Sequence, residues 1–212
     1  MTDVTALFGL RVTTPRLTLR VGTTGEVRAL GELAQRGIHP PEEMPFGVAW
    51  ADRTALPGFL DEFASFHREA LTGWSADDWH LNLLVWEHGA LVGTQGVGGE
   101  RFAERRVAST GSWLGREAQG RGIGTEMRAA VLELVFRGLG ADAATSGWLE
   151  GNAASGRVSE KLGYRETGVS EVSPRGTPVP HHDVRIDRAD WRSPVEVEIT
   201  GLGTCLALFR AT

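Results

Sequence analysis

The segment that most constrains this sequence is GREAQGRGIG, residues 115–124, in which four of ten residues are glycine. The pattern before it, VASTGSWLG (107–115), predicts a strand, and the helical spacing of Ile123, Met127 and Val131 predicts a helix after it. Glycines allow backbone conformations that a Cβ forbids, so successive N–H groups can point to one centre. The helix start adds unpaired donors and the positive end of its dipole. The segment therefore predicts a phosphate site built from main chain, to which Arg121 would add a fixed positive charge. A simple helix-capping turn is the alternative.

Two common phosphate motifs fit this segment poorly. A P-loop requires Lys and then Ser or Thr after its second glycine, where this chain has Arg121 and Gly122. A dinucleotide fingerprint requires G-x-G-x-x-G, but Thr125 stands where the third glycine belongs. Glu150, at the end of the next predicted strand, would then bind a ribose. A nucleotide-dependent oxidoreductase therefore stays an alternative, which NADH binding would favour.

The rest of the chain alternates between strand and helix patterns. Thr23 and Glu26 predict a capping box that opens a helix, and Asn152 predicts the cap of a later helix that ends at Gly163. Further helices are expected over 52–72 and 123–139, and strands over 16–21, 80–99 (a hairpin), 107–115, 143–151, 164–173 and 181–187. This order predicts an α+β (α/β) fold with one sheet in a single domain, residues 1–191, followed by a strand or arm over 192–212.

Composition and charge narrow the classes of partner. The formal net charge of −5 argues against nucleic acid and anionic membranes, and uninterrupted apolar runs such as residues 83–86 are too short to span a bilayer. MTDVTALFGL lacks the basic start of a secretory signal, so a cytoplasmic location is expected. Cys205 is the only cysteine, and its apolar surroundings predict a buried thiol. No metal site is expected, because His181 and His182 are adjacent rather than at ligand spacing.

Two motifs carry a resemblance to a known family. The first, Gln119-Gly120-Arg121-Gly122-Ile123-Gly124, resembles the acetyl-CoA signature Q/R-x-x-G-x-G/A of the Gcn5-related N-acetyltransferases (GNAT). The second, NAASGRVSEKLGYRETG (152–168), resembles the next helix and strand of that family. Its Asn-x-x-Ser form is closest to the branch containing the ribosomal-protein N-terminal (Rim-type) acetyltransferases. With TPRLTLR and SWLG, the similarity spans most of residues 14–190 in the family's order.

The resemblance implies a mixed, mostly antiparallel sheet with helices on both faces. Two parallel strands, 107–115 and 143–150, would splay apart and hold acetyl-CoA in the V between them. Its amide-bearing pantetheine would pair with the unpaired strand groups at Trp113 and Leu114 and contact Asn152 and Ser155. Its pyrophosphate would bind the loop that comprises Gln119, Gly120, Arg121, Gly122, Ile123, Gly124 and Thr125.

The resemblance also implies direct transfer of the acyl group to a primary amine in a ternary complex. The backbone N–H of Leu114 is the candidate oxyanion donor. The tyrosine that many members use as the acid is replaced here by Ser159, and Tyr164 is expected in the core. Ser155 matches the serine of the ribosomal-protein branch; it either protonates the CoA thiolate or only helps to start its helix. The candidate general bases are Glu100, and as alternatives Glu42, Glu43, His181 and His182.

The proline-rich segment HPPEEMPF (39–46) is the expected wall of the acceptor site. Its candidate acceptor-binding residues are the carboxylates Glu42 and Glu43 and the apolar side chains Met44 and Phe46. This combination suits an amine on an apolar stem, in a small molecule or a peptide. The signature recognises CoA rather than the acyl group, so succinyl-CoA or another acyl donor stays open. A non-catalytic acyl-CoA-binding protein also stays open. The apolar C-terminal arm would pack on the domain or pair across a homodimer.

Overall fold

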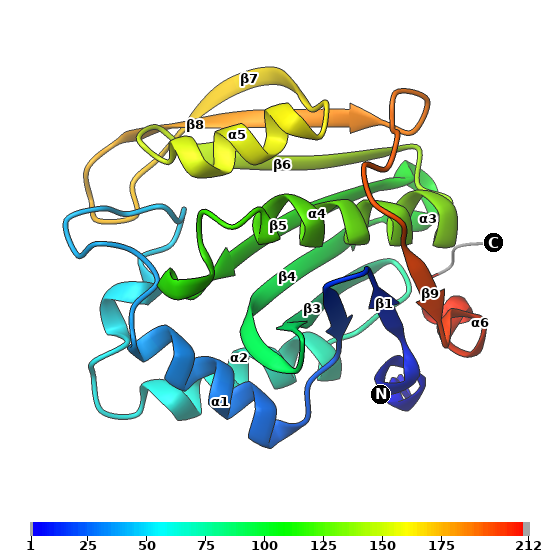
Figure 1. Cartoon of the computed structure of the whole chain (residues 1–212), viewed down its shortest axis with the longest axis horizontal. Helices are drawn as coiled ribbons and strands as arrows, with labels where there is room; N and C mark the ends of the chain where they lie inside the picture. The colour runs from blue at the N-terminus through cyan, green and yellow to red at the C-terminus, as the bar shows by residue number, and fades with distance from the viewer. Residues whose placement is uncertain (1, 210–212) are drawn as a thin grey trace.

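The computed structural model describes residues 2–209, which build one nine-stranded mixed sheet (Figure 1). The strands follow the order β7-β8-β6-β5-β4-β3-β2-β1-β9, and every neighbouring pair is antiparallel except β5–β6. They are β1 (Arg11–Thr13), β2 (Leu17–Arg20), β3 (Asp78–Glu87), β4 (Ala90–Glu100), β5 (Val107–Leu114), β6 (Ala143–Leu149), β7 (Arg165–Val172), β8 (Val179–Asp187) and β9 (Glu198–Thr200). The expected mixed, mostly antiparallel sheet is confirmed.

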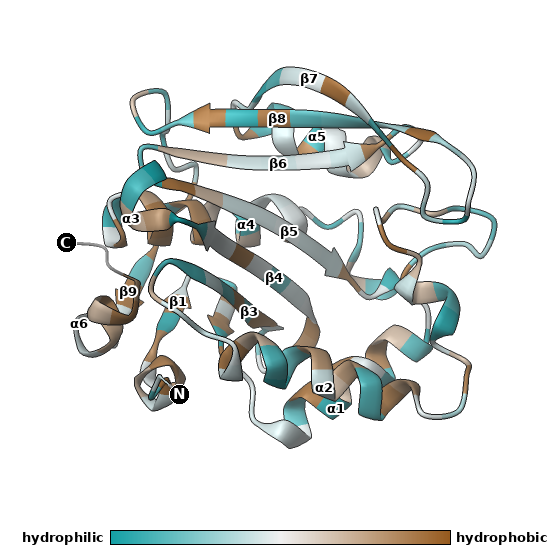
Figure 2. Ribbon diagram, turned by 180° about the vertical axis from the view of Figure 1, so that it is seen from behind, coloured by the Kyte–Doolittle hydropathy of each residue, from teal (hydrophilic) through white to brown (hydrophobic). Residues whose placement is uncertain are grey.

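Helices cover both faces of this sheet (Figures 1 and 2). They are α1 (Thr24–Gln35), α2 (Phe59–Thr72), α3 (Phe102–Arg105), α4 (Ile123–Glu133), α5 (Ala153–Lys161) and α6 (Leu202–Cys205), and α4 continues as a π-helical turn, Leu134–Gly138. One hydrophobic core contains Ile123 of α4, and a second contains Leu30 of α1 and Phe63 of α2. Along β3, Leu83 belongs to the first core and Leu84 to the second, because successive strand residues point to opposite faces.

Local sequence signals explain where several elements begin. The predicted capping box is confirmed, since Thr23 Oγ1 accepts from the Glu26 N–H and Glu26 Oε2 accepts from the Thr23 N–H at 2.8 Å. The Asn152 side chain caps α5 by accepting from the Ser155 N–H at 3.2 Å, as predicted. The β3–β4 hairpin closes on His88 and Gly89 with φ values of 47° and 87°, which a two-residue turn of this twist requires.

Two segments differ from the expected pattern. Helix α2 begins at Phe59 rather than near residue 52, because Gly58 adopts a φ of 82° and Trp50–Arg53 forms a separate 3₁₀ turn. Leu56 and Phe66, apolar residues within the predicted helix 52–72, are 53% and 58% exposed. Strand β1 was not expected from the pattern, because it has three residues and is defined by its pairing with β2 and β9.

The parallel pair β5–β6 opens into the expected V. The two strands pair only from Val107–Ser109 to Ala143–Thr145. Just beyond, Ser146 Oγ donates to the Thr110 carbonyl at 3.0 Å, and this contact marks the apex. From there β5 stays paired with β4, and β6 stays paired with β8 to its end at Leu149. The outer halves of β5 and β6 therefore leave strand edges free to face a ligand.

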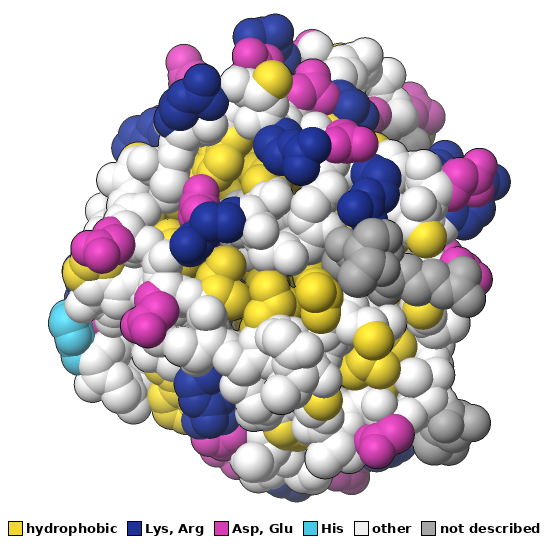
Figure 3. Space-filling model, turned by 90° about the vertical axis from the view of Figure 1, so that its right-hand side faces the viewer, with side chains coloured by type: hydrophobic (Ala, Val, Ile, Leu, Met, Phe, Trp, Pro, Cys, Tyr) yellow, Lys and Arg dark blue, Asp and Glu magenta, His cyan; other side chains and the backbone are white. Residues whose placement is uncertain are grey.

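The C-terminal segment continues the sheet of its own chain. β9 pairs antiparallel with β1, and the Trp74 Nε1–H donates to the Leu208 carbonyl at 2.9 Å. The buried Phe209 ring lies edge-on to Trp74 and Trp79, with centroids 5.2 and 4.9 Å apart. Cys205 is buried. On the side of the molecule that carries β9 and α6, hydrophobic side chains gather at the centre among charged ones (Figure 3). Within residues 2–209, no helix is long and apolar enough to cross a bilayer.

Candidate active site

A cavity of about 630 Å³ occupies the V between β5 and β6. Its walls come from β5, β6, the glycine loop, α4, α5, the segment 38–47 and the start of β8. On one side of the sheet, Trp148 of β6 lies against Gly156 of α5. On the other side, Trp113 of β5 packs against Trp50 and Phe63. Since Trp148 and Trp113 both line the cavity, it reaches both faces of the sheet, and two molecules can approach each other through it.

The glycine loop has the backbone geometry of an anion site. Gly120 and Gly122 have φ values of 72° and 80°, which favour glycine. Gly122 is the N-cap of α4, and no side chain among residues 2–209 caps this helix start. The N–H groups of its first turn therefore remain available, with the positive end of the helix dipole behind them. Gly124 and Thr125 of this turn line the cavity, as do Gln119, Gly120 and Gly122.

Gln119 holds the loop in place from inside the protein. Its Nε2 donates to the Ile38 carbonyl at 2.7 Å and to the Leu114 carbonyl at 2.9 Å. The amide therefore joins the end of β5 to the segment that forms the opposite wall. Trp113 and Leu114, the last residues of β5, both line the cavity as expected, whereas Ile123 is buried in the core beneath the loop.

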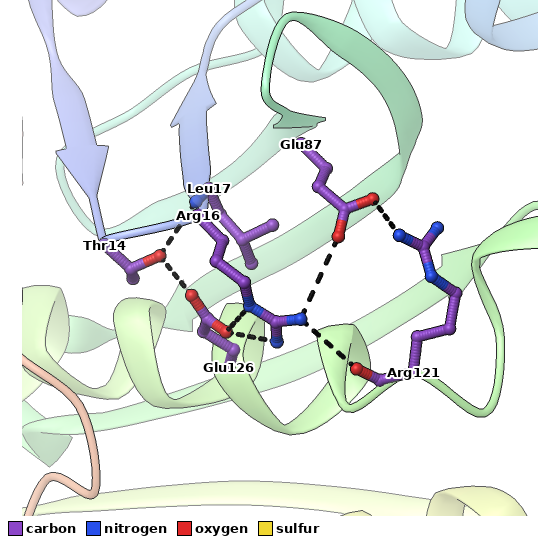
Figure 4. A network of polar contacts seen from close by, with 6 residues as sticks. All are labelled: Thr14, Arg16, Leu17, Glu87, Arg121 and Glu126. Carbon is purple, nitrogen blue, oxygen red and sulfur yellow. Dashed lines mark hydrogen bonds and ion pairs between the residues drawn. The ribbon is translucent and has the colours of Figure 1, made fainter.

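Arg121 points away from the cavity, contrary to the expectation that its charge faces a phosphate. Its guanidinium forms an ion pair with Glu87 of β3 at 2.8 Å (Figure 4). Arg16 extends this network: its Nε and Nη2 donate to Glu126 Oε2 at 2.8 and 2.5 Å, and its Nη1 donates to the Arg121 carbonyl at 3.3 Å. Thr14 completes it by donating to Glu126 at 2.5 Å. These contacts, called the anchor network below, fix the loop and the start of α4 to the β1–β2 turn and to the end of β3.

A buried arginine that the sequence did not single out lies at the apex of the V. Arg128 of α4 is 3% exposed; its Nη1 donates to Ser146 Oγ at 2.8 Å and its Nη2 to Ser112 Oγ at 3.3 Å. It forms no ion pair with a carboxylate among the described residues, and its Nε has no hydrogen-bond partner there. Burial raises the pKa of nearby Tyr164, an effect that the Arg128 charge opposes. Tyr164 is thus a neutral core residue, as expected.

The start of α5 forms the far wall. Asn152 lines the cavity, and its Nδ2 donates to the Pro45 carbonyl at 3.4 Å, which ties this wall to the segment 38–47. Ser155 also lines the cavity, and its hydroxyl has no hydrogen-bond partner within residues 2–209. Arg157 and Lys161 line the same space one turn apart. Their i, i+4 spacing in the sequence was a usable signal for a basic helix face.

The proposed acceptor residues divide into two pairs. Glu43 and Phe46 line the cavity, whereas Glu42 and Met44 lie outside it. Phe46 packs against Trp50 with ring centroids 5.2 Å apart. Arg175 holds the segment by donating to the Glu42 carbonyl at 3.4 Å. Glu43 is the only carboxylate among the described residues that line the cavity, so basic groups predominate there.

Glu100 lies apart from this cavity. It stands at the end of β4, forms an ion pair with Arg105 at 3.0 Å and borders a separate hollow of about 370 Å³ beside Trp79 and His80. This position does not support its expected role as general base. His181 of β8 does line the main cavity, with Nδ1 3.0 Å from Asp183 Oδ1. Among residues 2–209, no group of three or more His, Cys, Asp and Glu side chains is placed to hold a metal ion.

Comparisons with known proteins agree with this geometry. A family model described as acetyltransferase (GNAT) domain matches residues 16–165. The structure is similar to Mycobacterium smegmatis RimJ in complex with CoA-disulfide, with a TM-score of 0.67 and 19% identity over 97% of each chain. It is similar to RimL, the ribosomal L7/L12 alpha-N-protein acetyltransferase, in complex with coenzyme A, with a TM-score of 0.63 and 17% identity over 84% of this chain and 97% of that one. The microcin C7 self-immunity acetyltransferase MccE, in complex with acetyl-CoA and AMP, has a TM-score of 0.62 and 16% identity over 82% of this chain and 93% of its own.

Proposed function

Because the chain belongs to the acetyltransferase (GNAT) domain family, we propose that it moves an acetyl group from acetyl-CoA to a primary amine by direct transfer in a ternary complex. This family is the one that the two sequence motifs indicated, so the protein is an N-acetyltransferase. Ribosomal-protein acetyltransferases are among the structures similar to it. The observation that carries the proposal is the cavity that crosses the sheet at the V. A donor on the α4–α5 side and an acceptor on the α1–α2 side would meet at its apex.

The donor is expected along the glycine loop and β5. The pyrophosphate would accept from the free N–H groups at the start of α4, and the pantetheine would follow the open edge of β5 at Trp113 and Leu114. Arg157 and Lys161 supply positive charge to the phosphates, the part that sequence reasoning gave to Arg121. In this position the Leu114 N–H is the proposed oxyanion donor.

Ser155 is the proposed acid for the leaving thiolate. The amine nitrogen forms a bond to the thioester carbon, the C–S bond breaks, and the sulfur takes a proton from the Ser155 hydroxyl, which regains the proton that the nitrogen loses as the amide forms. Two facts support this assignment: Ser155 lines the cavity, and its hydroxyl has no partner within residues 2–209. Asn152 orients the backbone of this turn through its cap to the Ser155 N–H.

The acceptor is proposed to be a primary amine on an apolar stem, in a small molecule or at the N-terminus of a peptide. Glu43 and Phe46 would bind the ammonium group and the stem. RimL, similar in fold, is described as acting on a ribosomal protein, which favours including N-terminal peptides in the search. A homodimer and a cytoplasmic location stay predictions. Light scattering during gel filtration measures the molar mass and therefore tests for the homodimer.

The first experiment is thermal stabilisation by acetyl-CoA, CoA, ATP and NADH, each at one concentration. A ligand at one hundred times its Kd stabilises a fold by about 2.7 kcal/mol, which is a clear shift in Tm. Stabilisation by the CoA compounds alone supports the donor site, whereas stabilisation by NADH alone supports an oxidoreductase. Release of free CoA thiol, measured with a panel of peptides and small amines, then tests transfer. Binding without turnover on the whole panel would favour a non-catalytic acyl-CoA-binding protein.

Arg128 favours a second candidate donor, an acyl-CoA whose acyl group ends in a carboxylate, such as succinyl-CoA. A buried guanidinium without a counter-charge is costly, and a carboxylate at the apex would pair with it. The test is the ratio of kcat/KM for succinyl-CoA over acetyl-CoA. A ratio above about ten, lost in Arg128→Gln, supports the second donor. A ratio below one leaves acetyl-CoA as the donor.

A further inference from the structure

A histidine–carboxylate pair lies on the acceptor side of the cavity. His181 Nδ1 is 3.0 Å from Asp183 Oδ1, and Ser170 Oγ of β7 donates to Asp183 Oδ2 at 3.0 Å. Nδ1 also lies 3.5 Å from Ser170 Oγ, so it faces a carboxylate and a hydroxyl. Nε2 has no hydrogen-bond partner among the described residues. A carboxylate beside Nδ1 favours the tautomer with its proton on Nδ1, in which the lone pair on Nε2 can take a proton.

The ring lies beside the apex of the V, where the two substrates would meet. A Cβ on Gly147 of β6 would come within 2.3 Å of His181 Cε1 and 2.6 Å of His181 Nε2, so the ring rests on the backbone of Gly147. Gly147 follows Ser146, whose hydroxyl marks the apex. Ser146 and Trp148 face α4 and α5, so Gly147 and the ring lie on the opposite face of the sheet. That is the face from which the acceptor would approach.

We propose that His181, oriented by Asp183, is the general base that deprotonates the acceptor amine. This inference rests on the proposed function, because it assigns a base to that reaction. His181 Nε2 takes one proton from the ammonium group, and the freed amine nitrogen bonds to the thioester carbon. Asp183 stabilises the imidazolium that forms, and this proton then leaves to solvent. As the C–S bond breaks, the nitrogen loses a second proton, which replaces the one that Ser155 gives to the sulfur. The balance is one amide, one CoA thiol and one proton for each acyl-CoA and ammonium group consumed.

The other histidines near the cavity are less suited to this task. Both ring nitrogens of His182 contact carboxylates, Glu150 and Glu166, each at 2.8 Å, and these hydrogen bonds raise the pKa of His182. Its ring stacks on Trp148, on the donor side. His39 Nδ1 contacts the Pro40 carbonyl at 2.7 Å, so its ring is oriented by a neutral group rather than by a carboxylate beside it.

The test uses His181→Gln and Asp183→Asn in the full chain, with an amine that the wild type acylates. A general base contributes about 10²–10⁴-fold, so we expect kcat to fall by that factor in His181→Gln, with the thermal shift by acetyl-CoA unchanged. Asp183→Asn should lower kcat by a smaller factor. The matched control is His88→Asn in the exposed β3–β4 turn, which should retain full activity.

The pH profile separates a base from a structural residue. The wild-type kcat should rise with pH through the range in which a histidine titrates, and this limb should be absent in His181→Gln. Asp183 lies beside His181, and the other charged groups that line the same cavity are Glu43, Arg128, Arg157 and Lys161. A His181→Gln enzyme within threefold of wild-type kcat, or with the same pH limb, overturns the inference and leaves the proposed function standing. A wild type that binds acetyl-CoA but acylates no amine overturns both.

Discussion

Breaking the anchor network should lower the free energy of unfolding by more than breaking an exposed ion pair would. Glu126 accepts three hydrogen bonds, two of them from the Arg16 guanidinium, and the two side chains are 11% and 38% exposed. Hydrogen bonds to charged groups contribute about 1.5–3 kcal/mol, against about 1 kcal/mol for neutral ones. We therefore expect Glu126→Gln and Arg16→Gln each to cost about 2 kcal/mol, and the pair to show a coupling energy of about 1–2 kcal/mol.

The assay is a double-mutant cycle by urea unfolding, with Tm as a second measure. For a chain of this size, 2 kcal/mol corresponds to a fall in Tm of about 4–8 °C. The matched control is the ion pair between Arg53 Nη2 and Glu62 Oε2, which are 2.7 Å apart. Their side chains are 56% and 57% exposed, so the expected coupling energy is below about 0.5 kcal/mol. Equal coupling energies for the two pairs would refute the reasoning. Because the anchor network fixes the glycine loop, Glu126→Gln should also raise the Kd for acetyl-CoA.

Three further predictions concern the donor site, the acid and the pH dependence of stability. Gly124→Leu would fill the cavity beside Val158, 3.5 Å from a Cβ at this position, and should raise the Kd for acetyl-CoA at least tenfold, or about 1.4 kcal/mol, by calorimetry. Ser155→Ala should lower kcat at least tenfold with the Kd for acetyl-CoA unchanged; a loss of stability alone would show that Ser155 only starts the helix. Burial lowers the pKa of His67 from 6.5 to about 4, with His80 as a second cause. Between these pH values the unfolded chain binds more protons, so the free energy of unfolding should fall by up to about 3 kcal/mol as pH drops from 6.5 to 4. His67→Phe should flatten this dependence in urea titrations, and an unchanged slope would contradict the assignment.

Local signals made much of the fold predictable. The caps at Thr23 and Asn152 and the turn at His88 depend on residues within four positions of each other, so the sequence pattern contains them. The start of α2 does not follow from the pattern, because apolar spacing continues through Leu56 although that residue is exposed. Strand β1 depends on partners far along the chain, at Glu198–Thr200.

The site was predictable where it consists of backbone and less so where it consists of side chains. The glycines at 120, 122 and 124 line the cavity as expected because their role depends on local conformation. The direction of Arg121 is set by Glu87, which lies on a strand 34 positions earlier in the chain. Arg128 has the pattern of a surface residue, and only the packing of α4 over the V buries it. His181 reaches the cavity because β8 pairs with β6 and Gly147 has no side chain to exclude its ring.

The pairing of β9 with β1 has a consequence for aggregation. Strand β1 would be an edge strand without it, with a row of unpaired N–H and C=O groups that can recruit another chain. The same segment covers the rings of Trp74 and Trp79 with Phe209. A protein shortened to residue 191 would expose both features at once, and we expect it to self-associate through this edge. The opposite edge strand, β7, carries charged side chains such as Arg165, Glu166 and Glu171, which oppose pairing with another chain.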